Sequence, residues 1–79
     1  MEEKTFTIAG KKVSLNKQAV ENAMKHVAPD TVARYSVRIG EHDYPIKQVV
    51  SVATGIPSIA FISTTAYRVL TQLGFDVSV

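Results

Sequence analysis

The hydrophobic and polar positions of residues 44–79 predict two short helices followed by a strand. Apolar residues recur twice at the i, i+3, i+4, i+7 spacing of a helix that packs one face on a core. Pro45 suits the first position of the first helix, and Gly55 and Gly74 suit the positions just past the two helix ends. The predicted apolar faces are Ile46, Val49, Val50 and Ala53, then Ala66, Val69, Leu70 and Leu73.

The link between these helices is apolar but has no regular period. We expect its large side chains to anchor it to the core; they are Ile56, Ile59, Phe61 and Ile62. Ser63, Thr64 or Thr65 can cap the second helix, because a side-chain oxygen there can accept from a free backbone N–H. Beyond that helix, alternation predicts a half-buried strand with Phe75, Val77 and Val79 on one face.

The stretch 5–15 predicts a β-hairpin. A two-residue turn at Gly10 and Lys11 places glycine first, as a type II′ turn requires. This register sets Ile8 opposite Val13 and Phe6 opposite Leu15, with the apolar residues on one face. We then expect a helix that Asn16 caps and that runs to about Ala28, where Pro29 stops it. Its apolar stripe is Val20, Ala23, Met24 and Val27.

Residues 32–39 alternate as a strand does, and 42–44 predict a short returning strand. The full order is ββαββααβ, which indicates a small α+β domain with an antiparallel sheet and about three helices. We expect a single domain over 5–79 after a flexible stretch 1–4. In the predicted strand 32–39, one face holds Tyr35, Val37 and Ile39, and the other holds Arg34, Ser36 and Arg38.

Size and composition narrow the functional classes. A chain of 79 residues has no room for both a core and a deep catalytic cleft. It contains no cysteine and begins without a signal-peptide pattern, so we expect a cytoplasmic protein. No charged residue lies between Lys47 and Arg68, but polar residues and a Gly-Ile-Pro break argue against a membrane span.

Catalytic and metal-binding patterns are weak. His26 and His42 are the only histidines and lie on different predicted elements. Glu41, His42 and Asp43 form a conceivable metal site, but neighbouring strand residues point to opposite faces, which favours a solvated turn. We therefore expect no enzyme activity, no metal and no cofactor.

Positive charge beside aromatic residues is the more informative pattern. The net charge is +2. Arg34 and Arg38 would project from one strand face about 13 Å apart, each within reach of a nucleic-acid phosphate, and ordinary solubilising arginines explain them equally well. Lys47 and Arg68 lie on outer helix faces. Tyr67 and the Tyr44–Pro45 pair add flat apolar surfaces, whose alternative role is packing.

The run from Tyr35 to Val77 follows the pattern YxVxxGxxxYPxKQV…AxRxLxxLGFxV. It resembles the sulfur-recognising DNA-binding domain of McrA-like HNH restriction endonucleases, and small uncharacterised bacterial proteins with the same pattern. The resemblance implies duplex DNA binding, with Tyr44 and Pro45 lining an apolar cavity for a phosphorothioate sulfur and Arg68 on the backbone. No HNH motif is present, so the resemblance does not imply cleavage.

The leading hypothesis is a small non-catalytic DNA-binding module, with phosphorothioate recognition as its finer form. Its site residues are Arg34, Arg38, Tyr44, Pro45, Lys47, Tyr67 and Arg68. One alternative is a protein-interaction module, such as an antitoxin-like or adaptor subunit, because the apolar stretch 46–62 could face a partner or a second copy. Another is RNA binding, since phosphate contacts and stacking tyrosines serve single strands equally well.

Overall fold

The computed structural model describes residues 3–31 and 34–78. It confirms the α+β class and the order ββαββααβ, with one added 3₁₀ turn, η1, between the last two helices. The elements are β1 (Lys4–Ile8), β2 (Lys11–Leu15), α1 (Lys17–Ala23), β3 (Ser36–Ile39), β4 (His42–Pro45), α2 (Ile46–Thr54), η1 (Ser58–Ala60), α3 (Ser63–Gln72) and β5 (Val77–Ser78).

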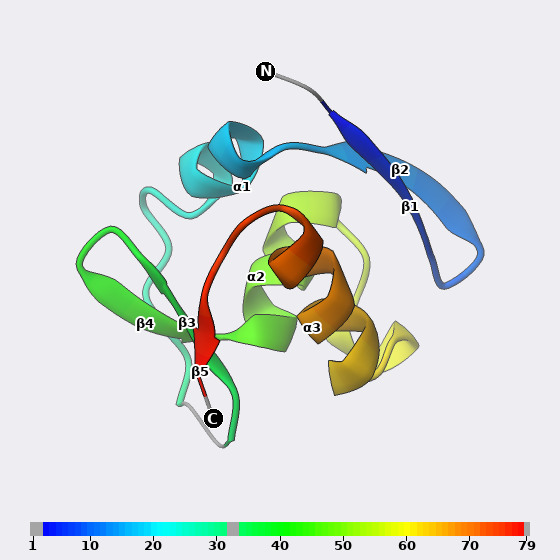
Figure 1. The fold of residues 1–79 in the computed structure, drawn as a ribbon. Coiled ribbons are helices and arrows are strands. Elements are labelled where there is room, and N and C mark those ends of the chain that lie inside the picture. Colours follow the sequence, from blue (N-terminus) through cyan, green and yellow to red (C-terminus); the bar gives the residue numbers. More distant parts are fainter. Residues whose placement is uncertain (1–2, 32–33, 79) are drawn as a thin grey trace.

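The strands form two separate antiparallel sheets. The β1–β2 hairpin stands alone, and β3 lies between β4 and β5 in a three-stranded sheet. Figure 1 shows α2 and α3 side by side next to this sheet, with α1 above it and the hairpin on the far side of the helices. The last strand therefore returns to the sheet that precedes the α2–α3 pair.

The core is built from the predicted apolar faces. Val49, Ala66 and Leu70 have no exposed surface, and Val20 and Met24 of the first helical segment are equally enclosed at 1 %. Burying a Val, Leu or Met side chain contributes roughly 1.5–3 kcal/mol to folding. The rest of the core comes from the strands and the link, and includes Phe6, Ile8, Leu15, Val37, Ile39, Tyr44, Ile56, Phe61 and Phe75.

The hairpin forms with a register different from the predicted one. Phe6 lies opposite Val13, and Ile8 opposite Lys11, so the turn residues are Ala9 and Gly10. Both have positive φ, +51° and +79°, as a type I′ turn requires and as the twist of a hairpin favours. The register moved by two residues in total, which preserves the parity of the strands. The predicted apolar face is therefore the face that is buried.

The first helix begins as predicted but ends early. The Oδ1 atom of Asn16 accepts a hydrogen bond of 2.7 Å from the backbone N–H of Ala19. The helix ends at Ala23 instead of near Ala28. Beyond this end, side chains from elsewhere bind the backbone: the Tyr44 hydroxyl donates to the Val27 carbonyl at 2.8 Å. A tertiary hydrogen bond thus satisfies a carbonyl of the segment that follows α1.

The starts of α2 and α3 differ from prediction, whereas their ends agree with it. Pro45 closes β4 with extended backbone (ψ 137°), so it precedes the first helical residue of α2 and does not occupy it. At α3 the N-cap is Ile62, without a side-chain hydrogen bond, and the three hydroxyl residues predicted as caps lie inside the first turn. Gly55 and Gly74 follow α2 and α3 with positive φ, as predicted.

The link between α2 and α3 is anchored at two of its four predicted positions. Ile56 and Phe61 are buried, whereas Ile59 is 93 % exposed and Ile62 66 % exposed. The turn η1 (Ser58–Ala60) rotates the intervening residues outward. No helix in the described ranges is long and apolar enough to cross a membrane.

The N-terminal end is more structured than predicted, whereas the C-terminal strand, β5, is shorter than predicted. Lys4, predicted to be flexible, is the first residue of β1, and its ammonium donates a 2.7 Å hydrogen bond to the Gln72 carbonyl. At the other end, Phe75 is a core residue and Val77 pairs with Val37. The predicted strand position at 79 lies outside the described residues. Within these limits, both ends of the chain are fixed to α3 or to β3.

Candidate functional site

An open groove lies where the segment before β3 meets the starts of α2 and α3. Its volume is about 350 Å³. We call it the Arg34–Lys47 groove, and its lining residues are Thr31, Arg34, Tyr35, Pro45, Ile46, Lys47, Ser63 and Thr64. It therefore unites three of the predicted site residues, Arg34, Pro45 and Lys47, from separate parts of the chain.

A second, smaller depression adjoins this groove. It has a volume of about 250 Å³ and is lined by Tyr35, Ser63, Thr64 and Tyr67. We call it the tyrosine notch. The two tyrosine rings meet edge to face, with centroids 6.1 Å apart and planes at 71°. The groove and the notch share three lining residues, so they form one continuous surface with a charged half and an aromatic half.

The two cations of the groove rest against aromatic rings. The Arg34 guanidinium carbon lies 5.8 Å from the centroid of the Tyr35 ring, and the Lys47 ammonium lies 5.8 Å from that of Phe61. Such contacts hold a cation without neutralising it. None of the described lining residues of the groove is acidic, and neither cation has an ion pair in the described part of the chain. The charge of the groove is therefore available to an anion.

The chain on one side of the groove is fixed by the side-chain amide of Gln48. Its Oε1 accepts from the Asp30 backbone N–H and its Nε2 donates to the Ala28 carbonyl, both at 2.9 Å. These two hydrogen bonds pair backbone groups of a loop that belongs to no strand or helix. It holds the chain just ahead of Thr31, the first residue that lines the groove. Gln48 is thus a positioning residue for the Arg34–Lys47 groove.

Arg38 does not join Arg34 as the sequence predicts. Arg34 precedes β3, which begins at Ser36, so the two arginines do not share a strand face. Arg38 lies opposite Asp43 in the β3–β4 ladder, and their side chains form an ion pair of 3.7 Å. The acidic partner of Arg38 thus comes from the next strand and not from its own. Both side chains are more than half exposed, which limits such a pair to roughly 0.2–1 kcal/mol.

Tyr44 is a core residue, and its predicted role as a readout surface is wrong in this structure. The side chain is 2 % exposed. Its hydroxyl donates to the backbone carbonyls of Val27 and Met24, at 2.8 and 3.3 Å. Alternation places Tyr44 on the inner face of β4, beside Val37 of the neighbouring strand. Of the predicted Tyr44–Pro45 pair, only Pro45 reaches the groove.

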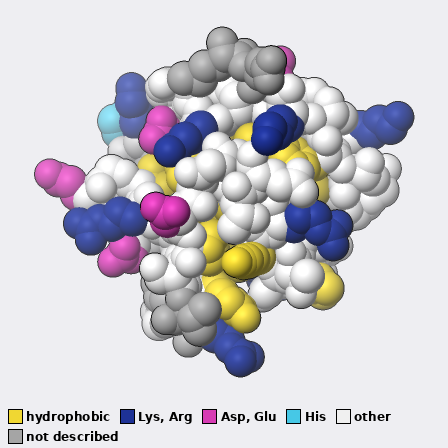
Figure 2. Space-filling view, viewed as in Figure 1, with side chains coloured by type: hydrophobic (Ala, Val, Ile, Leu, Met, Phe, Trp, Pro, Cys, Tyr) yellow, Lys and Arg dark blue, Asp and Glu magenta, His cyan; other side chains and the backbone are white. Residues whose placement is uncertain are grey.

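The two remaining predicted residues lie on α3. Tyr67 is 43 % exposed and forms one wall of the tyrosine notch. Arg68 is exposed, as predicted, but lies in the middle of the helix and lines neither the groove nor the notch. In Figure 2 the acidic side chains of the visible face lie mainly over the side where β4 and α1 are found, whereas Lys and Arg side chains are spread over the whole face, that side included.

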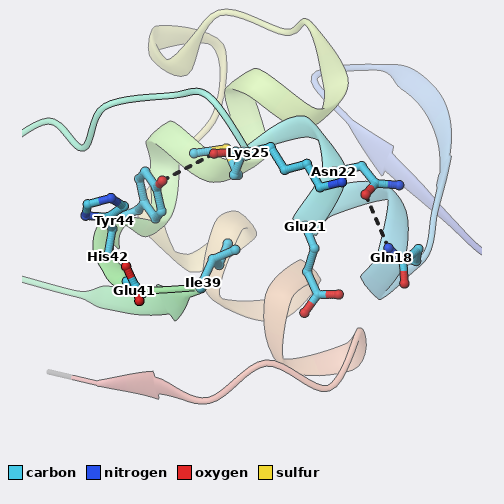
Figure 3. A pocket seen from close by; sticks show the side chains of 10 residues that line it. Gln18, Glu21, Asn22, Lys25, Ile39, Glu41, His42 and Tyr44 are labelled. Atoms are coloured by element: carbon cyan, nitrogen blue, oxygen red, sulfur yellow. Dashed lines mark hydrogen bonds between the residues drawn. The ribbon is translucent and has the colours of Figure 1, made fainter.

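A third depression, of about 440 Å³, lies elsewhere, between α1 and the β3–β4 turn (Figure 3). Figure 3 shows Glu21 and Lys25 on one wall and Glu41 and His42 on the other. Its charges are mixed, which favours no single class of charged ligand. No group of three potential metal-ligating side chains occurs among residues 3–31 and 34–78. In particular, Asp43 pairs with Arg38 and does not converge with its neighbours Glu41 and His42.

Sequence reasoning missed Tyr35, Ser63 and Thr64 as site residues. Strand alternation places Tyr35 on the same face as Val37 and Ile39, yet it is only half-buried and lines both depressions. The signal that selected Tyr67, an aromatic ring next to an arginine, also applies to Tyr35 beside Arg34. The two hydroxyl residues were interpreted as helix caps. Their exposure follows from the start of α3 at Ser63, which no pattern indicated.

No curated protein matches this chain, and no solved structure matches it. A family model described as SCO5918-like matches residues 5–79, which is nearly the whole chain. Apart from Lys4 at the start of β1, the matched region contains the sheets and helices of the described residues and every residue of the groove and the notch. The chain therefore belongs to the SCO5918-like family.

Proposed function

We propose that the chain is a small, non-catalytic, cytoplasmic DNA-binding module whose Arg34–Lys47 groove holds the phosphate backbone. The observation that carries the proposal is the pairing of two cations in a groove without a described acidic lining residue. Phosphate contacts of this kind supply most of the sequence-independent affinity for DNA. Arg68 on the adjoining face of α3 is a further backbone contact in this proposal.

The resemblance to the sulfur-recognising domain gives the finer form, a preference for phosphorothioate DNA. A sulfur on phosphorus is less hydrated than oxygen, so an apolar wall favours it. With Tyr44 in the core, that wall would consist of Pro45 and Tyr35, which both line the groove beside Lys47. The finer form thus depends on a different aromatic residue from the one that the resemblance indicates.

The test is fluorescence anisotropy at low and moderate salt with a short duplex, the same duplex carrying one phosphorothioate, and the matching single strand. Replacing Arg34 and Lys47 together with alanine should lower affinity and reduce the slope of log K against log salt by about two. The matched control replaces Lys11 and Lys12 with alanine, which removes the same amount of charge from the exposed hairpin. An equal loss of DNA affinity in both double variants would show that the effect comes from net charge alone and not from the groove.

The outcomes separate the forms of the proposal. Tighter binding of the thioated duplex supports sulfur recognition, and equal salt-dependent binding of both duplexes leaves a general DNA-binding module. The absence of salt-dependent binding to every probe contradicts the proposal. DNA and RNA both carry the phosphates that the groove would contact in this proposal. A matching RNA duplex is therefore measured in the same series, to compare the affinities for the two polymers.

A second candidate function, self-association, is favoured by the link between α2 and α3. Ile59 and Ile62 are largely exposed, and Val52 of α2 is 40 % exposed. The segment between Lys47 and Arg68 carries no charge, so two copies can face each other there without electrostatic repulsion. Light scattering across a concentration series tests this. A dimer that Ile59→Ser with Ile62→Ser dissociates supports it, and a monomer at all concentrations contradicts it.

A further inference from the structure

We infer that the tyrosine notch holds one unpaired base of a DNA strand whose phosphates lie in the Arg34–Lys47 groove. This inference rests on the proposed function and adds the class of substrate, a strand with at least one base free of its partner. Its starting point is that the notch and the groove share Tyr35, Ser63 and Thr64. A ligand that enters one depression therefore lies directly beside the other.

The tyrosine notch and the Arg34–Lys47 groove are lined by different kinds of residues, and these match the two ends of a nucleotide. The notch is lined by two tyrosines and two hydroxyl residues and has no charged lining residue in the described part of the chain. The groove brings the two cations. A nucleotide has a flat, weakly polar base at one end and an anionic phosphate at the other. Base stacking on aromatic rings beside a basic track is the general mode of single-strand binding.

The geometry of the tyrosines leaves a stacking surface free. In an edge-to-face pair, one ring points its edge at the other, so the faces of that first ring are not covered by its partner. Tyr67 is 43 % exposed, so part of its ring surface reaches solvent. Its position on α3, with Tyr35 from the segment before β3, opens the notch to the surface beside Ser63 and Thr64. A flat base can enter there without moving the core.

A paired base cannot use this notch, because its faces are covered by its neighbours in the duplex. Extruding it costs a few kcal/mol, which single strands do not pay. The inference therefore predicts an order of affinities that phosphate contacts alone do not produce. A single strand with bases should bind more tightly than an otherwise identical strand without them.

The experiment compares a short thymidine strand with the same strand carrying abasic sites throughout, by anisotropy at one salt concentration. We expect the thymidine strand to bind about tenfold more tightly. Tyr67→Leu, which keeps an apolar side chain, should bring this ratio close to one. Tyr67→Phe keeps the ring and should preserve the ratio. Arg34→Ala should weaken both strands by a similar factor.

The failures of the two proposals are distinguishable. Equal salt-dependent binding of both strands by the unaltered protein overturns the notch and leaves the groove in place. A thymidine preference that Tyr67→Leu does not reduce also overturns it, because the base would then lie elsewhere. No binding of either strand, together with no binding of duplex, removes the groove as well. Circular dichroism of each variant confirms that the fold is retained.

Discussion

The hydroxyl of Tyr44 donates a 2.8 Å hydrogen bond to the backbone carbonyl of Val27. It also lies 3.3 Å from the Met24 carbonyl. One side chain of β4 thus donates a hydrogen bond to a backbone carbonyl just after α1, where the chain has left the helix. This bond connects the N-terminal half of the chain to the three-stranded sheet.

Tyr44→Phe should lower the free energy of unfolding by about 1–2 kcal/mol, because it removes the hydroxyl that donates to the Val27 carbonyl while the ring still fills the core. Chemical denaturation measures the change. DNA affinity of the folded variant should equal that of the unaltered protein, since the ring is buried. A selective loss of affinity at unchanged stability would return Tyr44 to the binding site.

The hairpin turn offers a stabilising substitution. Ala9 has φ +51°, a left-handed conformation that costs most L-residues roughly 1 kcal/mol and that asparagine tolerates better. Ala9→Asn creates Asn-Gly, the pair preferred in type I′ turns. We expect a gain of about 0.5–1 kcal/mol in unfolding free energy by urea denaturation. The control Ala19→Asn, on the exposed face of α1, should not stabilise.

Two isoleucines in the link between α2 and α3 test whether burial, and not apolar character alone, determines how much a residue stabilises the fold. Ile56 is 3 % exposed and Ile59 is 93 % exposed, although the sequence assigns both to the core. Ile56→Ala should cost about 2–5 kcal/mol through lost burial and a cavity. Ile59→Ala should change stability by less than about 0.5 kcal/mol, as most surface substitutions do. Similar losses at both positions would contradict the orientation of η1.

These cases show which features of the fold the pattern of residues determines. Helix faces and the buried face of the hairpin follow from periodicity, and each was predicted correctly. The hairpin register was not, because Ala9–Gly10 and Gly10–Lys11 are both acceptable two-residue turns that bury the same face. The early end of α1 was not predicted either, and the Val27 carbonyl beyond it is bound by a tyrosine distant in sequence, which no local pattern contains.

The candidate site divides in the same way. Outward charges on helices, such as Lys47, are predictable from period alone. The separation of Arg34 from Arg38 depends on where β3 begins and on the cross-strand partner Asp43. The burial of Tyr44 was already implied by strand alternation, since it pairs with Val37. Sequence reasoning gave that residue an exposed role because of its neighbour Pro45.

The end of α3 is a Schellman motif, in which glycine has a specific role. The Phe75 N–H donates to the Leu70 carbonyl at 3.0 Å, and the Gly74 N–H donates to the Thr71 carbonyl at 3.1 Å. Gly74 has φ +95°, and an added Cβ would meet no atom within 4 Å. Gly74→Ala should therefore cost about 1–2 kcal/mol through backbone conformation alone.

Thermal or urea unfolding measures this cost at Gly74. Gly74→Asn should lose less than Gly74→Ala, because asparagine adopts positive φ more readily. An equal loss for both residues would indicate a steric cause that the open surroundings of Gly74 do not provide.

Gln48 links the stability of the loop to the shape of the groove. Its amide binds the Asp30 N–H and the Ala28 carbonyl at once, and Lys47 beside it lines the groove. Gln48→Leu retains the size of the side chain and removes both bonds without changing charge. We expect a loss of about 1–2 kcal/mol in unfolding free energy and faster hydrogen exchange at the Asp30 amide.

Gln18→Leu is the matched control, because Gln18 is an exposed glutamine of α1 whose amide binds only Asn22 within the described residues. It should leave exchange at Asp30 unchanged. If the groove binds phosphates, Gln48→Leu should also weaken duplex binding although it removes no charge, since the segment that leads to Arg34 loses its attachment to α2. Unchanged exchange at Asp30 would show that the loop is held by other contacts, and Gln48 would then have no positioning role.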